Sequence, residues 1–148
     1  PGMIAAKLLL NSPVKIINIS VDAQPLYTDE DMVENVQSVY QSLGIDPPDR
    51  NTISAVIHND FAYSGAGYGK PTQEAADAIL EVAQEEGILM DPIYTGKVMS
   101  GLLDYIKTGQ LTSRSRALFW HTGGIGSLFM GEPFNREIWD SFSPSDYL

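Results

Sequence analysis

Apolar residues recur along the chain in two rhythms, one typical of amphipathic helices and one typical of buried strands. Helical spacing predicts four helices: over 3–10, from a Thr28 cap to Gly44, from a Thr72 cap to Gly87, and one that ends at Lys107 and Gly109 with Val98, Met99, Leu102, Leu103 and Ile106 inward. β-Branched or aromatic runs predict strands over 14–21, 53–58 and 117–121. We expect a short helix after Gly124 and a surface segment from Gly131 onward.

The alternation of helices with strands of the buried type predicts an α/β fold. Such a fold places helices on both faces of a mostly parallel sheet, in three layers joined by right-handed crossovers. No internal repeat, low-complexity tract or linker divides residues 1–148. The chain opens inside a predicted helix with no cap before it, which suggests either a missing beginning or simple fraying.

Composition narrows the classes of partner and chemistry. The formal charge of −10 argues against nucleic acid and anionic membranes as partners, because Lys and Arg supply most of that attraction. The absence of Cys excludes disulfides, thiolate metal sites and Cys nucleophiles. No apolar run approaches the ~20 residues of a membrane span, and the first residues do not resemble a signal peptide. We therefore expect a soluble, cytoplasmic protein.

Three polar clusters follow predicted strands or lead into helices, at 58–68, 91–97 and 121–124. Ligands of open α/β sheets bind at such positions, although a strand–Thr-Gly-Gly–helix junction is often only a tight turn. Neither the dinucleotide fingerprint nor the P-loop pattern is present. His58 and His121 have no metal-ligand spacing, so no metal site is expected.

Tyr68 and Tyr94 lie in turns flanked by Gly and Pro, where a large aromatic side chain has no packing reason to be. A phenol presented from a loop becomes a usable acid or base once its surroundings lower its pKa. These two residues are therefore candidate catalytic groups.

Three motifs give the sequence a specific resemblance. Gly67-Tyr68-Gly69-Lys70-Pro71-Thr72, Asp91-Pro92-Ile93-Tyr94-Thr95-Gly96-Lys97 and His121-Thr122-Gly123-Gly124 stand in the order and spacing found in one enzyme family. The chain resembles the C-terminal part of the D-cysteine desulfhydrase and 1-aminocyclopropane-1-carboxylate (ACC) deaminase family. The resemblance implies a tryptophan synthase β-like fold, pyridoxal phosphate as cofactor and a small amino acid as substrate.

Carried over by residue, the resemblance implies that Tyr94 lies against the cofactor ring and substrate, with Tyr68 beside it. Thr95 and Thr122 would lie at the pyridine nitrogen edge, next to Gly123. ACC deaminases are expected to carry Glu and Leu at the positions of Thr95 and Thr122. A carboxylate there keeps the nitrogen protonated, whereas a hydroxyl suits loss of a good leaving group such as sulfide. The pair therefore favours a desulfhydrase, or a related lyase acting on cysteate.

In one respect this chain departs from the pattern of the family that it resembles. The Schiff-base lysine of this family belongs to the N-terminal half, and none of Lys7, Lys15, Lys70, Lys97 and Lys107 stands in that context. Lys97 is better interpreted as a residue at the start of a helix. We therefore expect this chain alone to lack turnover, to pair with the missing N-terminal half and to form a homo-oligomer. ACC deaminase and a non-catalytic binding module remain alternatives.

Overall fold

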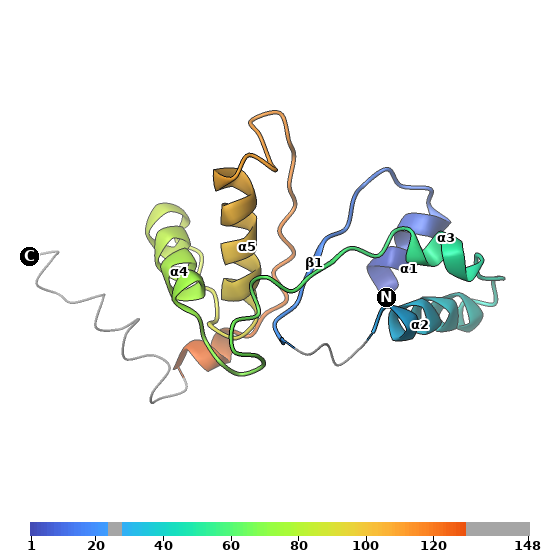
Figure 1. Cartoon of the computed structure of the whole chain (residues 1–148), viewed down its shortest axis with the longest axis horizontal. Helices are drawn as coiled ribbons and strands as arrows, with labels where there is room; N and C mark the ends of the chain where they lie inside the picture. The colour runs from blue at the N-terminus through green and yellow to red at the C-terminus, as the bar shows by residue number, and fades with distance from the viewer. Residues whose placement is uncertain (24–27, 130–148) are drawn as a thin grey trace, which may run out of the picture. The chain divides into compact units, whose positions relative to one another are not determined.

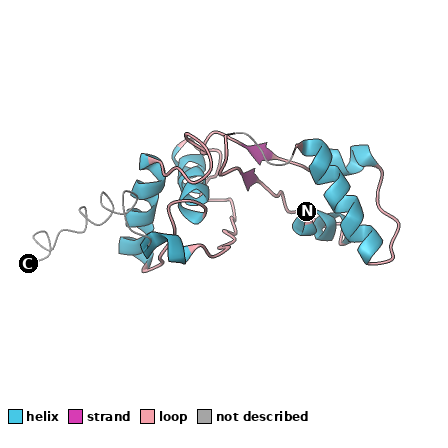
Figure 2. Cartoon of the chain, turned by 90° about the horizontal axis from the view of Figure 1, so that it is seen from below, coloured by secondary structure: helices cyan, strands magenta, loops and turns pink. Residues whose placement is uncertain are grey.

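A computed structural model describes residues 1–23 and 28–129 of the chain, mostly as helices joined by long loops (Figures 1 and 2). The elements in chain order are α1 (Gly2–Leu9), β1 (Asn18–Ile19), α2 (Asp29–Ser42), α3 (Arg50–Ser54), β2 (Asn59–Asp60), α4 (Gln73–Glu86), α5 (Thr95–Lys107) and the 3-10 helix η1 (Ile125–Phe129). The surface segment predicted from Gly131 lies outside the described residues.

The four predicted helices are confirmed, and their ends lie where the capping signals indicate. Thr28 and Asp31 form a reciprocal capping box at the start of α2, in which the Thr28 side chain accepts from the Asp31 amide. Thr72 accepts from the Ala75 amide at 3.1 Å and starts α4. Gly87 ends α4 in the left-handed conformation, with a φ of 68°. One inward position was wrong, because Ile106 is 54% exposed.

The predicted strands are shorter than the sequence indicates. Within the segment 14–21 only β1 is paired, and its partner β2 lies just after the predicted strand 53–58. The two form a two-stranded parallel sheet. Residues 117–121 form no strand. A strand needs neighbours on which to satisfy its backbone groups, and the described residues supply few. Leu118 and Trp120 are accordingly exposed, by 84% and 62%.

The error at 53–58 has a local cause. The side chain of Asp49 accepts from the Thr52 amide at 3.0 Å and from the Thr52 hydroxyl at 2.6 Å, which starts α3. Ile53 lies in that helix and is fully buried among other apolar side chains. The prediction of a strand over 53–58 overlooked Asp49 as a helix cap.

The chain divides into two compact units. The helical unit comprises the described parts of Pro1–Asn18 and Gln24–Asp60, and its core lies between α1, α2 and α3. The site unit comprises Ile19–Ala23 and the described residues from Phe61 onward. In the site unit α4 and α5 lie side by side (Figure 1) and bury Ala78, Ile79, Val82, Met90 and Met99. None of the described helices combines the length and apolar character of a membrane span.

Candidate functional site

The turn before α5 is built around the carboxylate of Asp91, which is completely buried. The carboxylate accepts from the amides of Ile93, Tyr94 and Thr95, each at 2.8 Å, and from the Thr95 hydroxyl at 2.7 Å. The first amides of a helix have no partner within the helix. Asp91 therefore acts as the helix cap from three residues upstream, while the Tyr94 side chain stays available.

These contacts also set the charge of Asp91. Burial raises the pKa of its carboxyl, but the hydrogen bonds from Thr95, Tyr94 and Ile93 together outweigh burial. The pKa of Asp91 thus lies below its ordinary value of 3.8, and the group is ionised at neutral pH. A fixed negative charge at the start of a helix is also favourable, because the helix dipole is positive there.

The third motif packs onto the same turn. The Ser127 hydroxyl lies 3.2 Å from the Asp91 carboxylate, and a ring nitrogen of His121 lies 3.1 Å from the carbonyl oxygen of Leu89. Gly124 has a φ of 88°. A Cβ atom at Gly124 would lie 2.6 Å from Asp91 Oδ1 and 3.1 Å from the Tyr94 ring. Only glycine fits both this conformation and this close approach.

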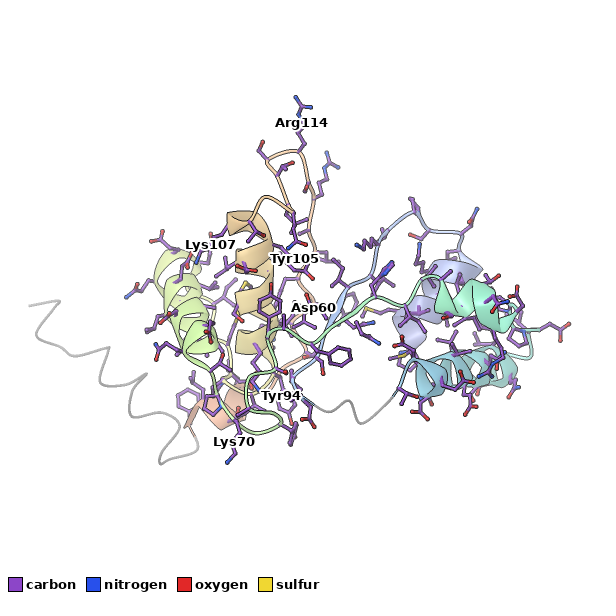
Figure 3. All side chains as sticks on the ribbon, viewed as in Figure 1. Asp60, Lys70, Tyr94, Tyr105, Lys107 and Arg114 are labelled. Carbon is purple, nitrogen blue, oxygen red and sulfur yellow. The ribbon has the colours of Figure 1, made fainter. Side chains whose placement is uncertain are left out.

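The first motif joins the site through its tyrosine. The phenols of Tyr68 and Tyr94 share a short hydrogen bond, and their rings meet edge to face with centroids 5.9 Å apart. Both rings remain accessible, with exposed fractions of 53% for Tyr68 and 37% for Tyr94. Figure 3 shows Tyr94 at the end of α5 opposite Lys107. The structure therefore brings together the two tyrosines that the sequence analysis singled out.

The pKa of Tyr94 moves in the direction opposite to the one considered from the sequence. The hydrogen bond with Tyr68 is the largest cause of a raised pKa, followed by desolvation and by the charges of Tyr68 and Asp91. The phenol of Tyr94 therefore keeps its proton at neutral pH. Such a group acts as a donor of a hydrogen bond or a proton rather than as a base.

The remaining predicted site residues differ in accessibility. Thr95 is buried, and its hydroxyl donates to the Asp91 carboxylate while accepting from the Asp91 amide at 2.9 Å. Thr122 and Gly123 are exposed, in the loop between His121 and η1. The Gly123 amide donates to His121 Nδ1 at 3.1 Å. Contact of these three residues with a cofactor stays a prediction.

Two residues of the site were missed by the sequence analysis. Ser127 contacts Asp91, and Asp22 accepts from the Tyr68 amide at 3.1 Å from a segment that precedes Tyr68 by more than forty positions. Ser127 lies three residues after a Gly-Gly pair, in the predicted short helix, and that position could have indicated it. Nothing in the local pattern around Asp22 indicates its partner, because the contact depends on how the chain folds back.

Lys97, by contrast, has the structural role that its position indicated. Its side chain is fully buried, and its ammonium donates to three backbone carbonyls. Elsewhere in the site unit, a shallow hollow between α4 and α5 is lined by acidic side chains, among them Glu74, Asp77 and Asp104. Within residues 1–23 and 28–129 no group of three or more His, Asp and Glu side chains could hold a metal ion.

Comparisons with known proteins identify relatives of this chain. Among characterised relatives, the chain is 32% identical over 114 residues to an ACC deaminase of Ralstonia pickettii, covering 77% of this chain and 33% of the relative. It is 46% identical over 71 residues to a D-cysteine desulfhydrase of Klebsiella pneumoniae, covering 48% and 22%. The chain thus spans about a third or less of the length of these relatives.

Comparisons with a solved structure and with a family model identify the same group of enzymes. A crystal structure of an ACC deaminase homologue superposes with a TM-score of 0.72 at 29% identity, covering 94% of this chain and 39% of that one. The agreement supports the predicted tryptophan synthase β-like fold. The model of the family described as "Pyridoxal-phosphate dependent enzyme" matches residues 2–123, which include the first two motifs and the third as far as Gly123. On this match, the chain belongs to the family of pyridoxal-phosphate dependent enzymes.

Proposed function

We propose that this chain contributes the tyrosine-bearing side of a lyase site that uses pyridoxal phosphate to eliminate the β-substituent of a small amino acid. The products from a D-cysteine-like substrate would be pyruvate, ammonia and sulfide. The observation that carries the proposal is the meeting of three motifs at the start of α5, where Tyr68, Tyr94 and Gly124 surround the Asp91 turn.

The residues present fit one side of such a cofactor. The accessible edges of Tyr94 and Tyr68 offer an aromatic surface and two phenols to a planar ring. The backbone of Gly123 is open, since no atom lies within 4 Å of a Cβ built there, so a ligand can approach it closely. Thr122 is exposed and would hold the pyridine nitrogen edge.

Each residue then has a distinct chemical task. The cofactor, when bound, supplies the electron sink for loss of the α-proton and the β-substituent. Tyr94 holds its proton and would donate it to the departing sulfur, which leaves more readily as neutral hydrogen sulfide than as hydrosulfide. Asp91 keeps the backbone of Tyr94 fixed, so that its phenol meets the substrate in one orientation.

The preference for a desulfhydrase over ACC deaminase depends on the hydroxyl residues near the pyridine edge. The Thr95 hydroxyl already donates to Asp91, so Thr122 is the residue we assign to the nitrogen. A neutral hydroxyl leaves that nitrogen unprotonated, which weakens the electron sink. The weaker sink suffices for elimination of sulfide, whereas opening an unactivated cyclopropane ring demands a stronger one.

A complete site needs groups that the described residues do not offer. Lys97 is unavailable as the Schiff-base lysine, because all three of its N–H donors bind backbone carbonyls. We therefore propose that a further segment of the family domain supplies the lysine and the phosphate loop. The exposed Leu118 and Trp120, in an extended segment without strand partners, mark one surface that such a segment would cover.

The proposal is tested by mixing the chain with the N-terminal part of the Klebsiella pneumoniae D-cysteine desulfhydrase and pyridoxal phosphate. We expect cofactor absorbance to follow complex formation, and pyruvate release from D-cysteine to exceed 2-oxobutyrate release from ACC. Tyr94→Phe should lower pyruvate release by about a hundredfold. The matched Tyr105→Phe, on the same helix but packed against Tyr63, should leave pyruvate release unchanged.

Two other outcomes would change the assignment. Faster release of 2-oxobutyrate than of pyruvate would assign the site to ACC deaminase instead. A complex that forms without cofactor absorbance or turnover, also with the N-terminal part of the Ralstonia pickettii ACC deaminase, would overturn the lyase proposal in favour of a binding module.

A further inference from the structure

Lys97 is the one lysine of the described residues that is fully buried. Its Nζ atom lies 3.0 Å from the carbonyl oxygen of Val21, 2.7 Å from that of Ser64 and 2.9 Å from that of Gly67. An ammonium has three N–H donors and no acceptor, so these three carbonyls occupy all of its hydrogen-bonding capacity. The amine is therefore neither a nucleophile nor a contact for a ligand.

The three carbonyls belong to the two segments that hold Tyr68. Ser64 and Gly67 bound the turn directly before Tyr68, and the Gly67 amide donates to the Ser64 carbonyl at 3.3 Å. Val21 precedes Asp22, whose carboxylate accepts from the Tyr68 amide. One ammonium thus binds both backbone segments that fix the position of this tyrosine.

Charge and close packing reinforce the same junction. Burial lowers the pKa of Lys97, and the carboxylate of Asp22 offsets part of that effect by raising it. Gly67 has a φ of 114°, and a Cβ atom there would lie 3.2 Å from Asp22 Oδ1. The Asp22 side chain, the turn and the ammonium therefore leave little room for Tyr68 to shift.

We propose that Lys97 is the positioning residue of the tyrosine pair: its ammonium joins the segment at Val21 to the turn at Ser64 and Gly67, and so places the Tyr68 phenol against that of Tyr94. The pair belongs to the site of the proposed function. The positioning itself depends only on contacts within this chain, so it is testable without cofactor.

The test follows the Tyr94 phenol in the 148-residue chain by NMR of 13Cζ-labelled tyrosine, with Tyr94→Phe to identify its signal. In Lys97→Met the three carbonyls lose their donor, and Tyr68 should leave Tyr94. We expect the titration midpoint of Tyr94 to fall toward its ordinary value, as in Tyr68→Phe, because the hydrogen bond between the two phenols is the largest cause of the raised pKa. Lys107→Met, at the exposed end of the same helix, should leave the midpoint unchanged.

A purely structural role for Lys97 predicts a different pattern. A folded Lys97→Met protein in which Tyr94 titrates as in the wild type would overturn the proposal. Lys97→Ala removes the stem as well, and propylammonium has the length of the missing atoms. We expect added propylammonium to restore the wild-type midpoint in Lys97→Ala. Loss of the pairing without any recovery on adding the amine would contradict positioning by the Lys97 amine.

If neither Lys97 variant folds, the substitution Asp22→Asn tests the proposal instead. It keeps an acceptor for the Tyr68 amide but removes the charge that faces the ammonium. We expect the Tyr94 midpoint to move in the same direction as in Tyr68→Phe, by a smaller amount. An unchanged midpoint would overturn the proposal. Failure of pyridoxal phosphate to bind would affect the proposed function alone, since none of these measurements uses the cofactor.

Discussion

The two units of this protein bury different kinds of side chain. The buried side chains of the helical unit are apolar, with Tyr40 as the one that carries a polar group, and its hydroxyl donates to the Ala5 carbonyl at 3.2 Å. The site unit buries Asp91, Thr95, Lys97 and Ser100 beside its apolar core. Its loops are thus held by buried polar groups in addition to apolar contacts.

The two units should therefore tolerate different kinds of substitution. An apolar core is non-directional, so related side chains of similar volume can replace one another. Buried hydrogen bonds are directional, and removing one partner leaves the other polar groups without a hydrogen bond and without access to water. We therefore expect the helical unit to respond to side-chain volume and the site unit to respond to side-chain chemistry.

The largest effect is expected for Asp91→Ala. The substitution leaves three amides and the Thr95 hydroxyl of a buried turn without their acceptor. We expect a loss of about 4 kcal/mol in the free energy of opening, measured by hydrogen exchange at the amides of α5. Glu85→Gln, on the exposed face of α4, serves as control. A loss of similar size at the amides of α2 would contradict the division into two units.

A loss nearly as large is expected for Ile53→Ala, which removes buried volume from the helical unit. Ile53 is fully buried among the side chains of α1 and α2, so truncation should cost about 3 kcal/mol at the amides of α2. Ile53→Val should cost only about 1 kcal/mol, because most of the volume remains. Equal losses from the two substitutions would show that this core does not respond to volume as we expect.

A smaller loss is expected for Gly124→Ala, with Gly126→Ala as its matched control two residues away. An alanine at Gly124 would bring its Cβ atom against the Asp91 carboxylate and would have to adopt a positive φ, whereas nothing lies within 4 Å of a Cβ at Gly126. We expect Gly124→Ala to lower the free energy of unfolding of the site unit by about 2 kcal/mol, and Gly126→Ala to leave it nearly unchanged. Hydrogen exchange at the amides of α5 would compare the two.

The smallest effect is on pH dependence. The pKa of Asp91 is lower in the folded chain than in the unfolded one, so the stabilisation that ionised Asp91 provides is present above pH 3.8 and is lost as the pH falls below that value. The difference in unfolding free energy between wild type and Asp91→Asn should therefore shrink below about pH 4. A difference that grows with acidity would mean that burial outweighs the hydrogen bonds.

The helices were predictable because their signals are local. A hydroxyl cap at Thr28 or Thr72 and a glycine at Gly87 act within one turn of the residues they organise. The strands were less predictable, because pairing needs partners distant in sequence. Residues 117–121 have strand composition, yet only Phe119 packs against the core while Leu118 and Trp120 stay exposed.

The site was predictable only in part, for the same reason. Tyr68 and Tyr94 stood out as large aromatic residues in glycine- and proline-flanked turns, and the structure joins their phenols. The direction of the Tyr94 pKa depends on that contact, so the sequence alone did not indicate it. The partners of Lys97 lie 30 to 76 positions away along the chain, and no local pattern identifies them.

Three motifs separated in sequence meet at the start of α5. Nuclear Overhauser contacts in the 148-residue chain test this arrangement most directly, with the Tyr63 and Tyr105 rings, 6.2 Å apart, as an internal reference. We expect cross-peaks between the rings of Tyr68 and Tyr94 and between the Gly124 α-protons and the Tyr94 ring. Presence of the reference cross-peak with absence of both others would contradict it.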